Sequence, residues 1–266
     1  MKVFLNPGHT PQWQIDAGLD NDCGTYGNGL YENIIAAEVC ELIAAESENF
    51  GIKIVDVYQS MNLKDITDVA NSTDADIFVS VHCNGGSPSA KGAETFYCAG
   101  SVEGKKLAGY VQKNIVAELQ MIDRGVKDDT QTQHSRIHVL RKSVMPAILI
   151  ELGFLTNGDD AKKLRDNQID FARAIVKGIA EYGGIIAENK KIGNYEKVAE
   201  KLKGANFNLE RHTDAIKLMA ILSGEECVNL LESACKNLGY PNLSYVDHSY
   251  FDGMLIHESL KILQKN

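Results

Sequence analysis

The chain has 266 residues, a formal net charge of −9 and a pI of about 5.3. This acidic balance argues against a nucleic-acid partner, because proteins that bind phosphate backbones present basic surfaces. Hydrophobic residues make up 44% of the chain and charged residues 24%, which is ordinary for a globular protein, and no run approaches the roughly 18 apolar residues of a membrane span. The length allows one α/β domain with a full core and a small appendage.

The start of the chain and its cysteines predict a reducing compartment. Residues 1–5 pass directly into an apolar strand pattern, which leaves no room for a secretion signal, so we expect synthesis in the cytoplasm. The six cysteines show no C-x-x-C spacing and fall largely within apolar segments. We therefore expect reduced thiols and no disulfides.

Apolar and amphipathic segments alternate through residue 183, which is the pattern of a mostly parallel, twisted sheet flanked by helices. The expected strands span residues 2–6, 52–58, 77–82, 93–97 and 147–151, with a further short strand at 137–140. The expected helices span residues 31–49, 62–72, 103–119 and 159–182. The pair Gly183-Gly184 ends the last helix. Residues 1–185 are therefore expected to form one α/β domain.

The C-terminal part of the chain follows a different pattern. Residues 186–194 contain the polar run Glu188-Asn189-Lys190-Lys191 and are expected to form a linker. From residue 195 to residue 266, apolar residues recur three and four positions apart, which predicts a small all-helical domain. This part contains no motif that indicates a chemistry.

Four polar residues stand where an apolar run stops or a helix is expected to begin. His9, His82 and Glu151 each close an apolar run, and the carboxyl ends of strands in an open α/β sheet meet at one crevice. Glu32 follows a glycine-rich loop and begins a helix, so its side chain can reach the same edge. Two histidines and one carboxylate with an open position are the ligand set of a catalytic zinc ion, and a separate glutamate beside it is the usual general base.

Single residues of this set also have simpler interpretations. A histidine at a strand end is more often a hydrogen-bonding residue than a metal ligand. A charged Glu151 after Ala-Ile-Leu-Ile, however, requires a cleft, a partner or a metal. Cys83 follows His82, and neighbouring strand residues point to opposite faces, which favours a buried structural thiol over a nucleophile.

Three polar positions are candidates for contact with a substrate. Asn84 either binds substrate or shapes the turn after its strand. His134 lies in the polar stretch 130–136, which is expected to be a surface loop at the groove and to offer a substrate contact. The long loop 10–30 carries the sole tryptophan, Trp13, and is expected to form one wall of the groove.

Several motifs occur in an order that resembles the zinc-dependent N-acetylmuramoyl-L-alanine amidases of the third amidase type. The resemblance spans about residues 2–183, and its motifs are Asn6-Pro7-Gly8-His9, Tyr31-Glu32-Asn33, Ala70-Asn71, 75–84, Gly92-Ala93-Glu94-Thr95-Phe96-Tyr97, Val139-Leu140-Arg141 and 146–157. It implies that His9, Glu32 and His82 bind Zn²⁺ and that Glu151 is the catalytic acid/base. It also implies cleavage of the bond between N-acetylmuramic acid and L-alanine in peptidoglycan.

The sequence departs from the family at two places. Members of the family usually have an arginine shortly before the Ala-Asn pair and another after the second strand. Residues 63–69 and 57–60 contain no arginine here. This departure affects the expected fine specificity and local ion pairs rather than the metal site.

The resemblance leaves several questions open. A phage endolysin that accumulates in the cytoplasm and reaches the wall after release, and a host autolysin, would share all these features. The C-terminal domain is expected to bind cell wall or to form homo-oligomers, and the alternative is a packing domain without a ligand. The alternatives are a different zinc hydrolase, carboxypeptidase-like or acting on N-acyl amino acids, and a non-catalytic wall-binding protein.

Overall fold

The computed structural model describes residues 1–132, 136–185, 233 and 236. The chain divides into two units, residues 1–188 and residues 189–266. Of the second unit only Ser233 and Lys236 are described, and both are helical. The predicted linker lies outside the described residues, and so does the all-helical domain apart from these two residues. The roles of this domain in wall binding and oligomerisation stay predictions.

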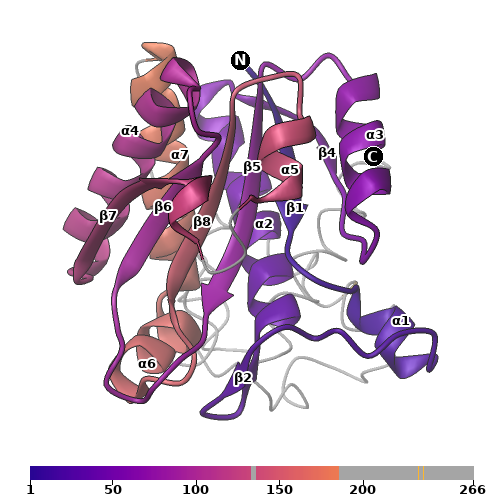
Figure 1. Ribbon diagram of the computed structural model, residues 1–266, viewed down its shortest axis with the longest axis vertical. Coiled ribbons are helices and arrows are strands. Elements are labelled where there is room, and N and C mark those ends of the chain that lie inside the picture. Colours follow the sequence, from indigo (N-terminus) through magenta and orange to yellow (C-terminus); the bar gives the residue numbers. More distant parts are fainter. Residues whose placement is uncertain (133–135, 186–232, 234–235, 237–266) are drawn as a thin grey trace. The chain divides into compact units, whose positions relative to one another are not determined.

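The first unit is built on a six-stranded sheet with the order β4-β1-β5-β8-β6-β7 (Figure 1). Strands β4, β1, β5 and β8 are parallel, β6 is antiparallel to β8, and β7 is parallel to β6. The strands are β1 (Lys2–Pro7), β4 (Lys53–Val57), β5 (Ile77–Asn84), β6 (Ala93–Tyr97), β7 (Asp123–Asp128) and β8 (Ala147–Phe154). The predicted mostly parallel sheet is confirmed.

Three long helices cover one face of the sheet. These helices are α2 (Glu32–Ser47), α4 (Val102–Leu119) and α7 (Gln168–Gly183). Helix α7 packs against both α2 and α4, while α2 contacts β1 and β5, and α4 contacts β6, β7 and β8. The strands turn continuous apolar rows toward this layer, such as Val79 and Val81 of β5, which are fully buried. Burial of these rows is the main source of stability.

The opposite face of the sheet is apolar at one end and polar at the other. Phe4, Phe78, Phe96 and Leu149 pack there with α3 (Leu63–Ser72) and α5 (His138–Lys142). Side chains two positions apart on a strand share a face, so His82, Glu151 and Glu94 continue the rows that Phe78, Leu149 and Phe96 begin. The shift from apolar to ionisable residues along β5, β8 and β6 separates the core from the groove.

Short elements complete the unit. They are α1 (Gln12–Asp16), the hairpin of β2 (Tyr26–Gly27) and β3 (Leu30–Tyr31), the 3₁₀ turns η1 (Glu48–Phe50) and η2 (Asp129–Gln131), and α6 (Gly158–Asp166). The described cysteines, Cys23, Cys40, Cys83 and Cys98, are all free. No helix within the described residues is both long and apolar enough to pass through a bilayer.

Four sequence predictions require correction. The predicted strand 137–140 is the start of α5, because Val139 and Leu140 are both buried and a short apolar run fits either element. The predicted helix 159–182 is two helices, α6 and α7, with a non-helical Asn167 between them (φ −126°, ψ 28°). Strand β7 was not predicted, because its sequence Asp-Arg-Gly-Val-Lys-Asp is polar, as edge strands often are. Strands β5 and β8 continue past His82 and Glu151, so these residues lie within the strands.

Candidate active site

His9 is presented by a strained turn after β1. Its backbone is left-handed (φ 63°), a conformation that is uncommon for a residue with a Cβ atom and is often found at functional sites. Its Nδ1 donates to the Asp22 carboxylate, whose oxygens lie 3.0 and 3.1 Å away. This bond orients the imidazole so that Nε2 faces the site. The adjacent Gly8 is required, because a Cβ there would lie 2.4 Å from Cε1 of His82.

Glu32 is the first residue of α2, and its carboxylate is buried at the centre of the site, with 3% of the residue exposed. Its Oε2 accepts the Thr25 N–H at 2.8 Å, and its Oε1 accepts the Cys83 N–H at 3.0 Å. The same Oε1 lies 3.0 Å from Nε2 of His9 and 2.9 Å from Nδ1 of His82. The helix N-terminus adds a favourable dipole. Glu32 is thus a fixed, ionised carboxylate.

The shifted pKa values in this cluster favour the charged forms of His9 and Glu32. Burial lowers the pKa of His9, but its bonds to Glu32 and Asp22 outweigh burial and raise that pKa to about 9. Burial raises the pKa of Glu32, but hydrogen bonds and charge from His82 and His9 outweigh it and hold that pKa well below its usual range. A carboxylate between two imidazoles therefore attracts positive charge to this point.

The three side chains form a candidate metal centre. One ligand atom each from His9, Glu32 and His82 can be chosen so that all lie within 4.8 Å of one another, and within the described residues this is the only such group. Two imidazole nitrogens and a carboxylate oxygen are a zinc donor set. A Cβ at Gly24 would lie 2.6 Å from the Glu32 carboxylate, so this close approach needs glycine. The residues present therefore fit a zinc ion.

Glu151 lies beside this centre on β8, directly opposite His82 of β5 and Glu94 of β6. Its Oε2 is buried and has no hydrogen-bond partner within the described structure. Burial and the neighbouring carboxylates of Glu32 and Glu94 raise the pKa of Glu151 well above its ordinary value. A buried carboxyl group with a raised pKa is suited to take up and return a proton, as a catalytic acid/base does.

Glu94 is a second buried carboxylate in this row, with 5% of the residue exposed. Its Oε2 pairs with the ammonium of Lys127 and lies 3.2 Å from Nε of Arg124. Its Oε1 accepts the Asn84 amide at 2.6 Å, while the Asn84 Oδ1 accepts the Gly85 N–H at 3.1 Å. The Asn84 side chain therefore shapes the turn after β5, and its contact with substrate stays a prediction.

A groove of about 1030 Å³ contains all of these residues. Asp22, Gly24 and Thr25 line it, so the loop 10–30 does supply part of the wall, but Trp13 is 63% exposed and lies outside the lining. His134 falls outside the described residues. In the segment 57–60, which lacks the arginine expected after the second strand, Gln59 donates to the carbonyls of Gly8 and Asn33 at 2.8 and 3.2 Å. These bonds tie the turn after β1 to α2.

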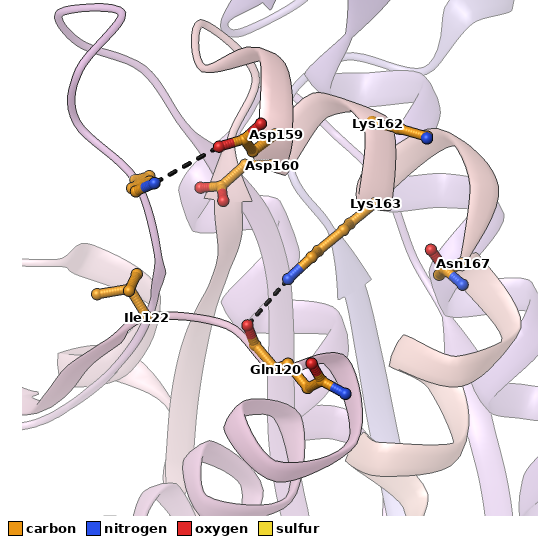
Figure 2. A pocket seen from close by; sticks show the side chains of 8 residues that line it. Gln120, Ile122, Asp159, Asp160, Lys162, Lys163 and Asn167 are labelled. Atoms are coloured by element: carbon orange, nitrogen blue, oxygen red, sulfur yellow. Dashed lines mark hydrogen bonds and ion pairs between the residues drawn. The ribbon is translucent and has the colours of Figure 1, made fainter.

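A smaller pocket of about 440 Å³ lies between the C-terminal end of α4 and α6 (Figure 2). Its charged groups have structural partners. Lys163 donates to the carbonyls of Leu119 and Gln120 at 2.8 and 2.9 Å, and Asp160 accepts the N–H groups of Gly92 and Phe154. This pocket is a junction that closes the C-terminus of α4, and it presents no candidate chemistry.

The sequence motifs assign no site role to Glu94, Arg124 or Lys127, although all three line the groove. Glu94 occurs in a motif of the resemblance, and the other two appear as ordinary charged residues in a segment without a predicted strand. Only the register of the sheet identifies them as groove residues, because it places Glu94 opposite Glu151. An antiparallel register between β6 and β8 has no local sequence signature.

The fold and the site together define an α/β protein in which a candidate acid/base lies beside a cluster of metal-type donors. A family model described as N-acetylmuramoyl-L-alanine amidase matches residues 3–181. The chain belongs to this amidase family, and the predicted resemblance is confirmed. As a member of the family, the protein is a peptidoglycan amidase.

Individual relatives support the same assignment. The uncharacterized protein YqiI of Bacillus subtilis (strain 168) is 38% identical over 177 residues, which cover 63% of this chain and 82% of that protein. The endolysin of Bacillus phage SPP1 is 31% identical over 190 residues, which cover 67% of each protein. The crystal structure of N-acetylmuramoyl-L-alanine amidase from Clostridium difficile 630 is 33% identical with a TM-score of 0.60, and the likeness covers 69% of this chain and 96% of that one.

Proposed function

We propose that this amidase uses a zinc ion, held by His9, Glu32 and His82, to hydrolyse the bond between the lactyl group of N-acetylmuramic acid and the L-alanine of the stem peptide. The observation that carries the proposal is the convergence of three donor atoms within 4.8 Å. A bound zinc ion supplies a Lewis acid that polarises the scissile carbonyl and makes water more acidic.

Residues around the ligands hold them in place. Asp22 orients His9, and the N–H groups of Thr25 and Cys83 orient the Glu32 carboxylate. Such outer contacts fix ligand geometry and tune metal affinity. Glu32 lies at a helix start and His82 within a strand, while His9 lies in the turn directly after β1 and is held by Asp22. The site is therefore organised before substrate arrives.

Glu151 is the proposed acid/base. A water oxygen attacks the carbonyl carbon while Glu151 accepts the water proton. The carbon–nitrogen bond then breaks, and Glu151 returns the proton to the alanine nitrogen. The products are a lactyl carboxylate and a stem peptide with a free amino terminus. The unpartnered Oε2 of Glu151 is available for this transfer.

The proposal is tested by digesting purified peptidoglycan and identifying the products by mass spectrometry. We expect free L-alanine amino termini on intact stem peptides, loss of these products with a chelator, and recovery when zinc is restored. The variant Glu151→Gln should retain zinc and lose activity. Hydrolysis that persists in metal-free protein would refute the zinc centre, and cleavage at another bond would refute the substrate assignment.

The two alternatives give different results in this experiment. A different zinc hydrolase would cleave N-acyl amino acids in preference to muramoyl peptides. A wall-binding protein without activity would sediment with peptidoglycan and release no product even when it is loaded with zinc. The motifs Asn6-Pro7-Gly8-His9 and 151–157 favour the amidase over another zinc hydrolase. The complete set of His9, Glu32, His82 and Glu151 favours it over a non-catalytic protein.

The biological setting follows from the substrate. We propose that the enzyme acts on the cell wall as an endolysin or autolysin, supported by its similarity to the phage endolysin. Lysis of whole cells by added enzyme, compared with lysis from within when a membrane pore is co-expressed, tests this setting.

A further inference from the structure

The groove carries a second charged cluster that the proposed mechanism does not use. Arg124 and Lys127 of β7 both form ion pairs with Glu94, and among the described residues Glu94 is the ion-pair partner of each. One cation suffices to compensate one buried carboxylate. The cluster of two cations and one carboxylate therefore carries a net positive charge at the groove wall.

The fold holds both cations toward the groove. Between Ala93 and Thr95 the register of β6 with β7 advances by one extra residue on β7, and Gly125 there has φ 88°. This is a β-bulge, a feature that re-aims side chains near functional sites. It lets Arg124 and Lys127, three residues apart, reach the same carboxylate.

Aromatic rings of the groove wall support the two side chains. The guanidinium of Arg124 lies 4.8 Å from the ring centroid of Phe154, and the ammonium of Lys127 lies 6.0 Å from that of Phe96. Both rings line the groove. The side chains remain partly exposed, at 33% for Arg124 and 27% for Lys127. They are therefore positioned by the protein and still open to a ligand.

The distance from the candidate metal centre indicates which part of the substrate meets these cations. His82, Glu151 and Glu94 lie on three adjacent strands in direct register. Strands are about 4.8 Å apart, so the Glu94 cluster lies roughly 10 Å from His82. An extended peptide advances about 3.3–3.6 Å per residue. A peptide that runs across the strands from the scissile bond thus brings its second or third residue to the cluster.

We propose that Arg124 and Lys127 form a carboxylate-recognition subsite that binds an acidic group on the second or third residue of the stem peptide. This inference rests on the proposed amidase function, because it deepens the specificity of the same site. Arginine and lysine bind carboxylates through charge-assisted hydrogen bonds. The enzyme would accordingly distinguish peptides with a free carboxylate from peptides in which that group is amidated.

The test compares matched muramoyl tripeptides that carry either a free carboxylate or a primary amide at the second residue, and a second pair that differs only at the third. We expect wild-type kcat/KM to be about tenfold higher for the acid of one pair, mainly through KM. Arg124→Gln and Lys127→Met should each reduce this preference to about twofold. The control Lys91→Met removes a cation outside the groove, which lies 3.5 Å from Asp159, and should keep the full preference.

Binding to the inactive Glu151→Gln variant gives a readout that is independent of turnover. Calorimetry with the same peptides should show tighter binding of the acid, and the difference should shrink as salt increases. Equal kcat/KM and equal binding for acid and amide in both pairs would overturn the subsite, as would variants that weaken both substrates equally. If wild type cleaves no muramoyl peptide, the proposed function fails, and the calorimetric comparison still decides whether the cluster binds carboxylates.

Discussion

The two faces of the sheet differ in the side chains that the strands present to them. On the face covered by α2, α4 and α7, the strands present fully buried Val79, Val81, Ile148 and Ile150. On the other face, the ends of the same strands present His82 and Glu151. Among the described residues, three that line the groove have a buried polar atom without a hydrogen-bond partner: Nε of Arg124, Nε2 of His138 and Oε2 of Glu151. One face is thus apolar along the strands, while the other changes from apolar residues to the ionisable residues of the candidate site.

The strongest test of this difference between the two faces replaces one buried carboxyl group by an amide on each face. Glu151→Gln should lower kcat by about 10²–10⁴-fold, because it removes the proposed proton carrier, and should leave the unfolding free energy nearly unchanged. The matched change Glu46→Gln alters a buried carboxyl group on α2 that pairs with Arg173 at 3.7 Å, away from the groove. We expect near-wild-type kinetics on a soluble muropeptide for this control. Equal losses of activity in both variants would contradict this difference between the two faces.

The converse test removes apolar volume from the helical face. Phe171 of α7 is fully buried, so Phe171→Ala should lower the unfolding free energy by about 3–5 kcal/mol through lost burial and a residual cavity. Denaturant titration measures this loss. The folded fraction of the variant should retain its kcat at low temperature. A large fall in kcat per folded molecule would show that the helical layer also tunes the site.

Asp22 tests how the groove face holds the proposed metal ligands. Asp22→Asn keeps the size of the side chain and weakens the bond to Nδ1 of His9. Loss of such an outer contact typically costs 10–100-fold in metal affinity, so competition with a chromogenic chelator should show weaker zinc binding. Asp16→Asn on the same loop is the control, because it contacts Gln12 and lies outside the groove. Unchanged zinc affinity in Asp22→Asn would remove Asp22 from the proposed site.

The effect of pH is smaller and has a defined sign. Burial opposes the charging of His9, but its bonds to Glu32 and Asp22 raise its pKa from 6.5 to about 9. The charged form is therefore favoured in the folded state, and its contribution is complete below pH 6.5 and lost as pH rises through about 9. Chelated protein should lose on the order of 1–2 kcal/mol of stability across this window. His9→Gln should flatten that slope, and an unchanged slope would place its source elsewhere.

The sequence predicted the arrangement of the site better than its surroundings. Parallel strands β1 and β5 place His9 and His82 at one edge by a general rule of α/β folds, and a helix start supplies Glu32. The sequence could group these residues because the apolar pattern of each strand is local and shows where the strand ends. By contrast, the short α5 resembled a strand, and the polar β7 gave no apolar alternation.

The second cluster could not be predicted, for a physical reason. Arg124 and Lys127 approach Glu94 only because β6 reverses direction beside β8 and β7 contains a bulge. Both features depend on contacts between segments far apart in the sequence. Charged residues of an edge strand and of a solvent-exposed loop have similar local sequences, so only the three-dimensional register distinguishes a groove wall from an ordinary surface.

The central claim is that His9, Glu32 and His82 form one metal centre on the groove face. X-ray diffraction from crystals of the zinc-loaded protein, recorded above and below the zinc absorption edge, tests it most directly. We predict a single anomalous peak in the described domain, within bonding distance of Nε2 of His9, a Glu32 oxygen and Nδ1 of His82. A peak on other side chains, or full activity in crystals without a peak at these three residues, would contradict the account.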